Sequence, residues 1–233
     1  MDTIFGRNPV REALRAKRVI SITISESFSD ESILELVRLQ SLPMKRVSGS
    51  ELDRKCNGVH QGVMAEIKPY EYLDLNELIK RSKKEKIPVI VMLDRINDPH
   101  NFGAILRSAD VFNVSGIIIG KHDQVPLNST VAKTSAGAIN FVPVSIVNNL
   151  NQTIEKLKEN GFWIVSTDGG ASTNYCDLKY DFPVCLVIGS EGEGVSKLIL
   201  KNSDYIVKIP QSGHVNSLNA SVAAGILLSR IRS

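Results

Sequence analysis

Amide, guanidinium, carboxylate and hydroxyl side chains recur just after apolar, strand-like segments in the second half of the chain. Asn101 and Arg107 follow one such segment, Glu191 follows another, and Ser217 and Asn219 follow a third. In open α/β sheets, ligands bind just outside the carboxyl ends of the strands. These three loops are therefore the expected sites of binding or catalysis.

The first loop, DRINDPHNFGAILRSAD, leads from an apolar run into a helix that begins near Pro99. Asn101 and Arg107 lie six residues apart, and we expect them on roughly the same helix face, converging near the end of the strand. A guanidinium is a planar, permanently charged donor suited to phosphate, so a nucleotide or a nucleic-acid backbone is one partner that fits. The alternative is a salt bridge at the surface or between subunits.

The second loop, VIGSEGEGVS, carries Gly189, Gly192 and Gly194 in the spacing GxxGxG. This spacing is not the dinucleotide-binding GxGxxG, and no Lys-Ser/Thr pair follows to form a phosphate-binding loop. A phosphate-bearing cofactor is therefore not indicated. The glycines would instead let the backbone pass close to a ligand, so that a Cβ at Gly189 would collide with it, while Glu191 projects from the turn.

The third stretch, IPQSGHVNSLNASVAAGILL from Ile209 to Leu228, has an extended lead-in that stops at Pro210 and a polar loop before a helix. Ser217 is the predicted helix N-cap. Free amides of such a loop and of the first helical turn can cradle a small molecule. The plainer interpretation is a core strand joined to an amphipathic helix by a polar turn.

The elements that position these loops form an α/β pattern. From residue 88 to 233, apolar strand-like runs alternate with helical segments, which is typical of a parallel sheet covered on both faces. Residues 1–68 read as a smaller α/β domain, with helices at Asn8–Ala16 and Asp30–Gln40. Residues 69–87 are the expected linker and leading helix, which ends in the basic RSKKEK.

Composition narrows the class of protein. The chain has 233 residues, 42% of them hydrophobic, which suits a packed globular protein. No run approaches a membrane span and the N-terminus lacks a secretory apolar region, so we expect a cytoplasmic protein. The four histidines show no ligand spacing, and no metal is expected. The three cysteines have no CxxC spacing and are predicted to be buried thiols.

A net charge of +3 is too mild to demonstrate binding to nucleic acid, but basic residues concentrate locally. Five of them lie near the first predicted helix, opposed by Glu12 alone: Arg7, Arg11, Arg15, Lys17 and Arg18. One face of that helix should therefore be cationic. It could contact RNA or be simply solvated.

Taken together, the three loops resemble the three signature motifs of the SpoU family of RNA ribose 2′-O-methyltransferases, in the SPOUT superfamily. Asn101-Phe102-Gly103 with Arg107 matches the first motif, Gly189 to Gly194 the second, and Ile209 to Leu228 the third. The preceding GRNPVREAL and HQGVMAEI resemble the bacterial branch that methylates a guanosine in the peptidyl-transferase P-loop of 23S ribosomal RNA. The resemblance covers essentially the whole chain.

The resemblance implies an α/β catalytic domain with a deep trefoil knot, against the general rule that chains are unknotted. It also implies an N-terminal RNA-binding domain of the ribosomal-protein L30e or L7Ae type. S-adenosylmethionine is the expected cofactor, and a homodimer whose two protomers share the site is the expected assembly. The implied cofactor contacts are Thr167, Gly189, Ile209 and Leu218, and the implied catalytic residues are Asn101, Arg107, Glu191, Ser217 and Asn219.

Three alternatives stay open at this level. A transfer-RNA 2′-O-methyltransferase would carry the same motifs. A non-catalytic RNA-binding protein of ribosome assembly could retain the fold, although the intact set of polar residues argues against it. Methylation that protects ribosomes from an antibiotic would share the chemistry and differ only in the nucleotide modified.

Overall fold

The computed structural model describes residues 2–214 and 217–233, which form two compact units. The first unit runs to Tyr70 and also includes Leu127–Phe141, whereas the second comprises Glu71–Pro126 and Val142–Ser233. The range 88–233 predicted for the catalytic domain thus contains one segment that packs with the first unit. The boundaries 1–68, 69–87 and 88–233 are predicted for domains that fold independently. Compact units do not test independent folding, so these boundaries stay a prediction.

The first unit is built on a four-stranded sheet of order β1-β4-β2-β3, in which only β2 and β3 are parallel neighbours. Its strands are β1 (Asp2–Phe5), β2 (Val19–Ser25), β3 (Met44–Val47) and β4 (Val63–Ile67), and its helices are α1 (Arg7–Arg15), α2 (Glu31–Leu39), α3 (Gly49–Lys55) and α6 (Ser129–Thr134), followed by the short helix η1 (Ala138–Asn140). The two predicted helices are confirmed. The sequence pattern missed β1 and α3 because neither is long enough to show a period.

The basic residues of α1 are mostly paired within the first unit. Arg11 donates to Asp30 Oδ2 at 2.8 Å and Arg15 to Glu12 Oε1 at 2.8 Å. The Arg18 guanidinium lies 4.3 Å from the centroid of the Tyr70 ring and donates to the carbonyls of residues 68 and 69. Of the five basic residues, Arg11 and Arg15 are thus neutralised by carboxylates, whereas Arg18 has only uncharged partners.

The second unit contains a seven-stranded sheet of order β7-β6-β5-β10-β8-β11-β9, and every pairing in it is parallel. Its strands are β5 (Val89–Asp94), β6 (Gly116–Gly120), β7 (Val144–Val147), β8 (Trp163–Thr167), β9 (Thr173–Asn174), β10 (Val184–Gly189) and β11 (Tyr205–Lys208). The predicted α/β class with a parallel sheet is confirmed. The apolar run at 141–147 forms a strand only from Val144 onward, after Pro143.

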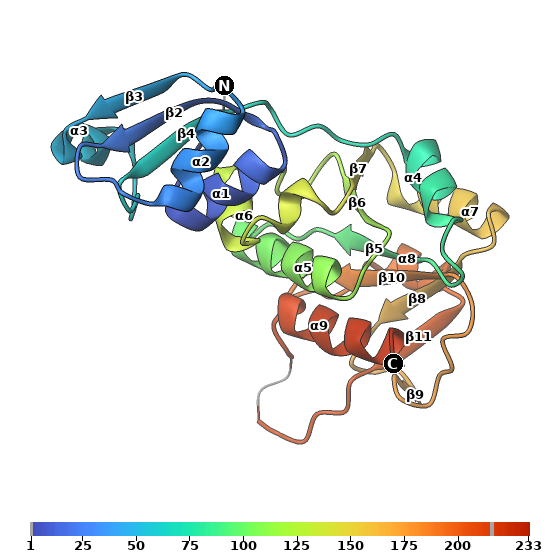
Figure 1. The fold of residues 1–233 in the computed structure, drawn as a ribbon. Helices are drawn as coiled ribbons and strands as arrows, with labels where there is room; N and C mark the ends of the chain where they lie inside the picture. The colour runs from blue at the N-terminus through green and yellow to red at the C-terminus, as the bar shows by residue number, and fades with distance from the viewer. Residues whose placement is uncertain (1, 215–216) are drawn as a thin grey trace. The chain divides into compact units, whose positions relative to one another are not determined.

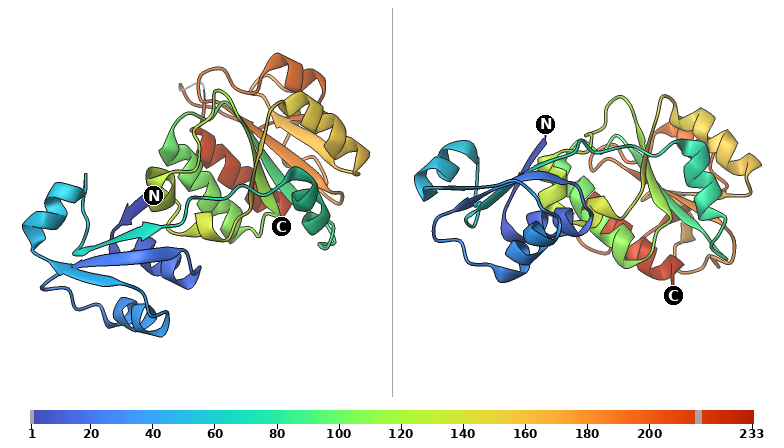
Figure 2. Two further views of the ribbon diagram at one scale, coloured as in Figure 1. Left: turned by 90° about the horizontal axis from the view of Figure 1, so that it is seen from above. Right: turned by 45° about the horizontal axis from the view of Figure 1, so that its top comes forward.

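Helices cover both faces of this sheet (Figures 1 and 2). One face packs against α4 (Leu75–Ser82), α7 (Leu150–Glu159) and α8 (Lys197–Lys201) through a buried cluster that includes Leu78, Met92 and Ile154. The other face carries α5 (Pro99–Val111) and α9 (Ala220–Ile231), which lie side by side. No helix in the described part of the chain is long and apolar enough to cross a membrane.

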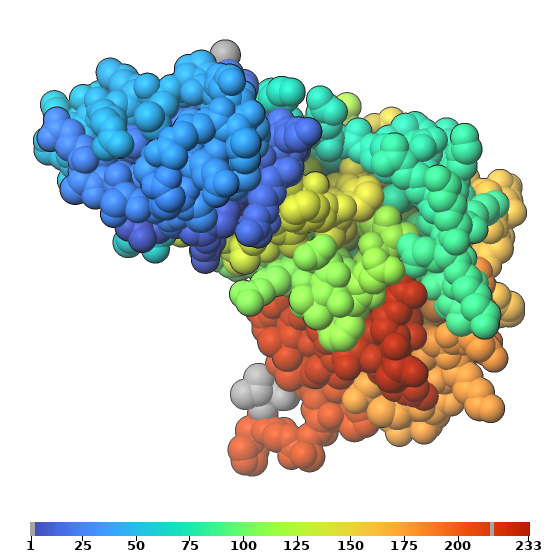
Figure 3. Space-filling view, in the orientation of Figure 1, coloured from blue at the N-terminus to red at the C-terminus, as the bar shows by residue number. Residues whose placement is uncertain are grey.

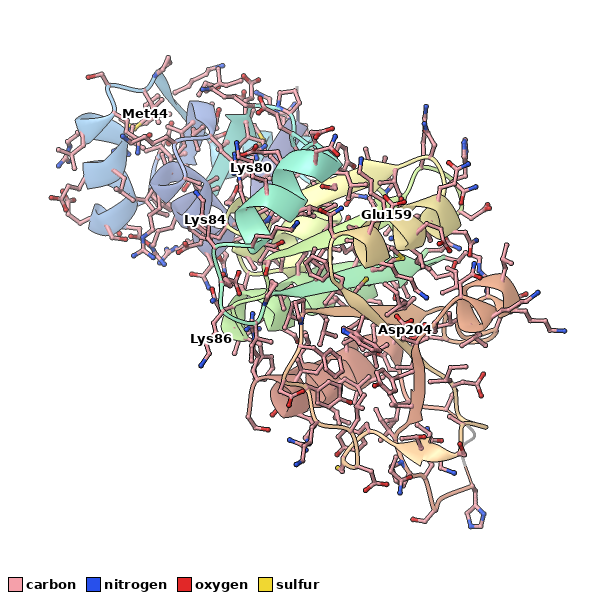
Figure 4. All side chains as sticks on the ribbon, turned by 90° about the vertical axis from the view of Figure 1, so that its right-hand side faces the viewer. Met44, Lys80, Lys84, Lys86, Glu159 and Asp204 are labelled. Atoms are coloured by element: carbon pink, nitrogen blue, oxygen red, sulfur yellow. The ribbon has the colours of Figure 1, made fainter. Side chains whose placement is uncertain are left out.

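The basic segment that ends the leading helix is exposed. Lys80, Lys84 and Lys86 point away from the core of the second unit (Figure 4). Arg81 is paired with Glu77 one turn earlier, at 2.9 Å. This segment therefore forms a solvated surface, as such charge runs usually do.

The cysteines divide into two kinds. Cys56 and Cys185 are buried as predicted, and burial raises the pKa of both thiols, so they stay protonated and unreactive. Cys176 is exposed, so the prediction is wrong for that residue. It lies in the loop after β9, and connecting loops run over the surface because their backbone polar groups need water.

We expect Arg232→Ala to destabilise the second unit. The Arg232 guanidinium donates to the carbonyls of Phe112 (3.0 Å) and Ile87 (2.9 Å), to that of Asn113, and to Glu85 Oε2 (3.0 Å). These bonds connect the end of α9 to the end of α5 and to the segment just before β5. Loss of these charge-assisted bonds should cost about 2 kcal/mol.

Urea unfolding followed by circular dichroism measures this as a lower transition midpoint. Lys201→Ala, which removes an equal charge from the exposed end of α8, is the matched control and should leave the midpoint unchanged. Equal midpoints for the two variants would show that the C-terminal contacts contribute nothing.

Candidate active site

Three polar side chains from distant parts of the sequence meet at one hydrogen-bonded cluster. Asn101, in the first turns of α5, donates from Nδ2 to Glu191 Oε1 at 2.9 Å. Asn219, at the start of α9, donates from Nδ2 to Asn101 Oδ1 at 2.8 Å and also to Glu191 Oε1. We call these three residues the amide–carboxylate cluster. The cluster brings together one residue from each of the three loops.

The cluster fixes the orientation of the Glu191 carboxylate. Both amide donors reach the same oxygen, Oε1, and no described residue donates a hydrogen bond to Oε2. Glu191 is exposed, whereas Asn101 is only 7% exposed, so a buried amide anchors an exposed carboxylate. An oriented carboxylate with one open oxygen can accept a proton or a hydroxyl hydrogen bond.

Asn219 also determines where the last helix begins. Its Oδ1 accepts from the backbone amides of Ser221 (2.9 Å) and Val222 (3.3 Å), which makes Asn219 the N-cap of α9. The prediction that Ser217 caps this helix is therefore wrong. The Asn amide both accepts from the helix and donates to Glu191, and this double bonding places the cap two residues later. Val215 and Asn216 of the same motif lie outside the described residues.

Arg107 does not join the cluster within one chain. Its side chain is exposed on α5, and none of its atoms bonds to Asn101, Glu191 or Asn219. The prediction that Asn101 and Arg107 share a face is wrong. Six residues advance a helix by about 1.7 turns, so the two side chains diverge by about 120° around its axis.

A cavity of about 260 Å³ lies beside the cluster, at the carboxyl ends of β8, β10 and β11. All four predicted cofactor contacts line it (Thr167, Gly189, Ile209 and Leu218), and so do Glu191 and Ser217. Ile188 and Ala223 contribute apolar lining, and the charged lining residues are Asp168, Glu191, Glu193 and Lys208, of which Glu193 is paired with Arg95. Carboxylates outnumber the one cation, so this lining suits a ligand with an apolar part and a positive charge.

The loop that carries Glu191 is anchored by the end of β5. Asp94 Oδ2 accepts from the backbone amide of Ser196 at 2.7 Å, and Asp94 is 4% exposed. Arg95 donates to the carbonyl of Gly194 at 3.3 Å and to the carboxylate of Glu193. Sequence reasoning missed both residues, although a charged pair that directly follows an apolar strand is the signal that could have found them.

Gly189 lies where the chain approaches its own backbone. A Cβ built there would overlap the carbonyl carbon of Gly194 and the amide nitrogen of Val195. The prediction that a Cβ at Gly189 would collide with the ligand is therefore wrong, because the Cβ would meet the backbone of the chain itself. The space is already filled by the returning loop, so glycine is required by the fold of the loop itself.

Comparison with known proteins places the chain in a family. A model described as the SpoU rRNA Methylase family matches residues 88–229, and one described as RNA 2′-O ribose methyltransferase substrate binding matches residues 3–73. A Staphylococcus aureus (strain MSSA476) protein, named for the TrmH family of tRNA/rRNA methyltransferases, is 45% identical, covering 99% of this chain and 95% of that protein.

Two solved structures illustrate the fold. The SpoU methyltransferase AviRb from Streptomyces viridochromogenes, in complex with AdoMet, superposes with a TM-score of 0.84 at 23% identity, covering 99% of this chain and 88% of that chain. The A. aeolicus TrmH/SpoU tRNA modifying enzyme superposes with a TM-score of 0.58 at 31% identity, covering 68% of this chain and 80% of that chain.

The family model over residues 88–229 and the S. aureus relative identify the class of the protein as RNA methyltransferases. Within that class, the chain belongs to the SpoU rRNA methylase family. Its cofactor is S-adenosylmethionine. The cavity fits this cofactor, because its apolar walls suit an adenosyl group and its carboxylates suit a sulfonium.

We expect Gly189→Ala to unfold the loop rather than merely to fill the cavity. Because the added methyl must displace backbone at Gly194 and Val195, the variant should lose about 2 kcal/mol of stability or more. Gly192→Ala is the matched control in the same loop, since its added Cβ would meet nothing within 4 Å. Thermal unfolding of the two variants is the measurement. A Gly189→Ala protein as stable as Gly192→Ala would contradict the close approach.

Proposed function

We propose that the chain transfers a methyl group from S-adenosylmethionine to the ribose 2′-hydroxyl of a guanosine in the peptidyl-transferase P-loop of 23S ribosomal RNA. The observation that carries the proposal is Glu191, which lines the cofactor cavity and is held at Oε1 by Asn101 and Asn219, while no described residue bonds to its Oε2. A ribose hydroxyl must lose its proton as it is methylated, and an oriented carboxylate is a suitable acceptor.

Thr167, Gly189, Ile209 and Leu218 would hold the cofactor, which supplies the methyl group when bound. Ser217 lines the same cavity and would bind the ribose with its hydroxyl. Much of the rate enhancement would then come from positioning the hydroxyl in line with the transferred group. Asn219 and Asn101 contribute by holding Glu191 still.

Arg107 would act as a phosphate clamp and as an electrostatic stabiliser of the developing alkoxide. A guanidinium has a pKa above roughly 12, so it is a poor proton acceptor. Its fork of N–H groups fits a phosphate of the RNA backbone. Because Arg107 does not reach the amide–carboxylate cluster of its own chain, we assign it to the cluster of a second protomer.

A homodimer would bring Arg107 to that position. Arg107 and Val111 lie four residues apart and share an exposed face of α5, and Val111 is 71% exposed. Val222, on neighbouring α9, is 48% exposed, and the surfaces of the two helices adjoin (Figure 3). Exposed apolar side chains beside a functional arginine support burial of this surface against a second copy, related by a two-fold axis.

We further propose that the second unit contains the trefoil knot of its family. The crowding of Gly189 against the backbone of Gly194 and Val195 supports a chain that turns back tightly after β10. A ribosomal rather than a transfer RNA substrate is supported by the family model that matches most of the second unit. A transfer RNA stays the second candidate, because the S. aureus relative is named for both substrates.

The decisive assay offers labelled S-adenosylmethionine with unmodified 23S ribosomal RNA or with bulk transfer RNA, and maps any 2′-O-methyl group. We expect label in the ribosomal RNA alone. Glu191→Gln should lower turnover at least about a hundredfold, since general-base groups contribute on that order, while calorimetry shows unchanged cofactor affinity. Label only in transfer RNA would select the second candidate, and label in neither would leave a non-catalytic RNA-binding protein.

Subunit complementation tests the shared site. Arg107→Ala and Glu191→Gln should each be inactive alone, but a heterodimer has one site with both defects and one site with neither. Random pairing should therefore restore up to roughly a quarter of wild-type activity. Native mass spectrometry verifies subunit exchange. Exchange without recovered activity would show that Arg107 does not act across a dimer interface.

A further inference from the structure

The first unit has a cavity of its own, of about 520 Å³. It lies where β1, β2 and β3 end and β4 begins, because β4 runs antiparallel to β1 and β2 while β3 is parallel to β2. The loops at that edge line it, and none of its lining residues belongs to the second unit. Its size falls within the range of about 300–1,000 Å³ typical of small-molecule sites.

Arg7 supplies a flat cationic surface at this cavity. Its guanidinium lies 5.5 Å from the centroid of the Phe28 ring, and its side chain is exposed. Arg11 and Arg15 are paired with carboxylates, whereas Arg7 forms no ion pair with any residue in the described ranges. Arg7 and Phe28 both line the cavity, so each presents a planar group on which a second planar group can stack.

Hydrogen-bonding groups surround this plane. The Gln61 side chain accepts from the backbone amide of Arg7 at 2.8 Å through Oε1, which directs its two Nε2 hydrogens elsewhere. The Ser25 and Ser27 hydroxyls lie 3.4 Å apart in the same lining and can each donate or accept. A planar ligand with donors and acceptors along its edge matches this set.

The floor of the cavity is kept open by a glycine. Gly62 has a φ of +80°, and a Cβ there would lie 2.8 Å from Ser25 Oγ and 3.2 Å from the Phe28 ring. The preceding Gln61 also has a positive φ, of 52°. A side chain at Gly62 would therefore crowd Ser25 and Phe28, which line the same cavity.

We infer that this cavity binds one unpaired nucleotide of the RNA substrate, whose base stacks on the Arg7 guanidinium and bonds through its edge to Gln61 and the Ser25 and Ser27 hydroxyls. Proteins that recognise RNA sequence usually bind unpaired bases, which leave the RNA stack and pack on aromatic rings or guanidinium planes of the protein. The inference rests on the proposed function, because it identifies the part of the RNA that the first unit holds.

The test compares binding of a short single-stranded RNA of mixed sequence with binding of the duplex that it forms with its complement, by fluorescence anisotropy at one fixed salt concentration. The full-length chain is used, because Leu127–Phe141 packs with the first unit and deletion of residues 1–68 would leave that segment without its partner. The variants are Arg7→Ala and Arg7→Lys, with Arg38→Ala as the control. Arg38 is equally basic and exposed, on α2 of the same unit.

We expect Arg7→Ala to weaken single-strand binding about five- to a hundredfold, the range found for loss of a base-stacking side chain, and to change duplex binding no more than Arg38→Ala does. Arg7→Lys should behave like Arg7→Ala, because it keeps the charge but loses the plane. If Arg7→Lys binds single strands as tightly as the unaltered chain, or if Arg7→Ala loses equal affinity for single strand and duplex, Arg7 contacts a phosphate and the cavity is not a nucleotide site. Equal behaviour of Arg7→Ala and Arg38→Ala would remove the site altogether.

Methyl transfer by the unaltered chain to ribosomal RNA separates this inference from the proposed function. A chain that methylates RNA but whose Arg7 variants bind single strands normally has the activity without the nucleotide site. A chain that transfers no methyl group fails the proposed function, whatever its Arg7 variants do.

Discussion

The tight return of the chain at Gly189 is the constraint on which the active site depends. The strand β10 lies at the centre of the parallel sheet, and the loop that leaves it folds back until Gly194 and Val195 touch Gly189. Asp94 and Arg95, at the end of the neighbouring strand β5, form hydrogen bonds to the backbone of that loop. This compact path brings Glu191 to Asn101 at the start of α5 and to Asn219 at the start of α9.

The neutral amides of Asn101 and Asn219 serve the site in a way that cations would not. They orient Glu191 through Oε1 without neutralising its charge, and in the proposed reaction its second oxygen would accept from the substrate hydroxyl. An arginine in the same position would compensate the carboxylate and compete with the substrate for it. The guanidinium of Arg107 stands apart in the single chain, where it remains available for phosphate.

Most arginines near α1 contact partners within the first unit. A cluster of arginines near α1 suggests a polyanion-binding face, yet Arg11, Arg15 and Arg18 are paired with acidic, carbonyl and aromatic partners of the same unit. Arg7 differs from these three residues because it lines a cavity of the first unit. Selectivity for RNA would then come from one placed side chain more than from total charge, in keeping with the small net charge of +3.

The sequence by itself determined the parallel α/β sheet and the three loops that form the site. Apolar runs such as VIVMLD and VCLVIG are short, are rich in β-branched residues and indicate buried strands of a parallel sheet. The residues directly after such strands lie at the carboxyl edge of the sheet. Tertiary structure decided the rest. Asn101 bonds to residues 90 and 118 positions away, and periodicity reports only on neighbours within about a turn or a strand pair. Periodicity therefore could not predict the helix cap at Asn219 or the bonds that Asp94 and Arg95 make to the Glu191 loop. It also could not predict that Arg107 lies apart from the cluster or why residue 189 must be glycine, because each of these depends on contacts between distant parts of the chain.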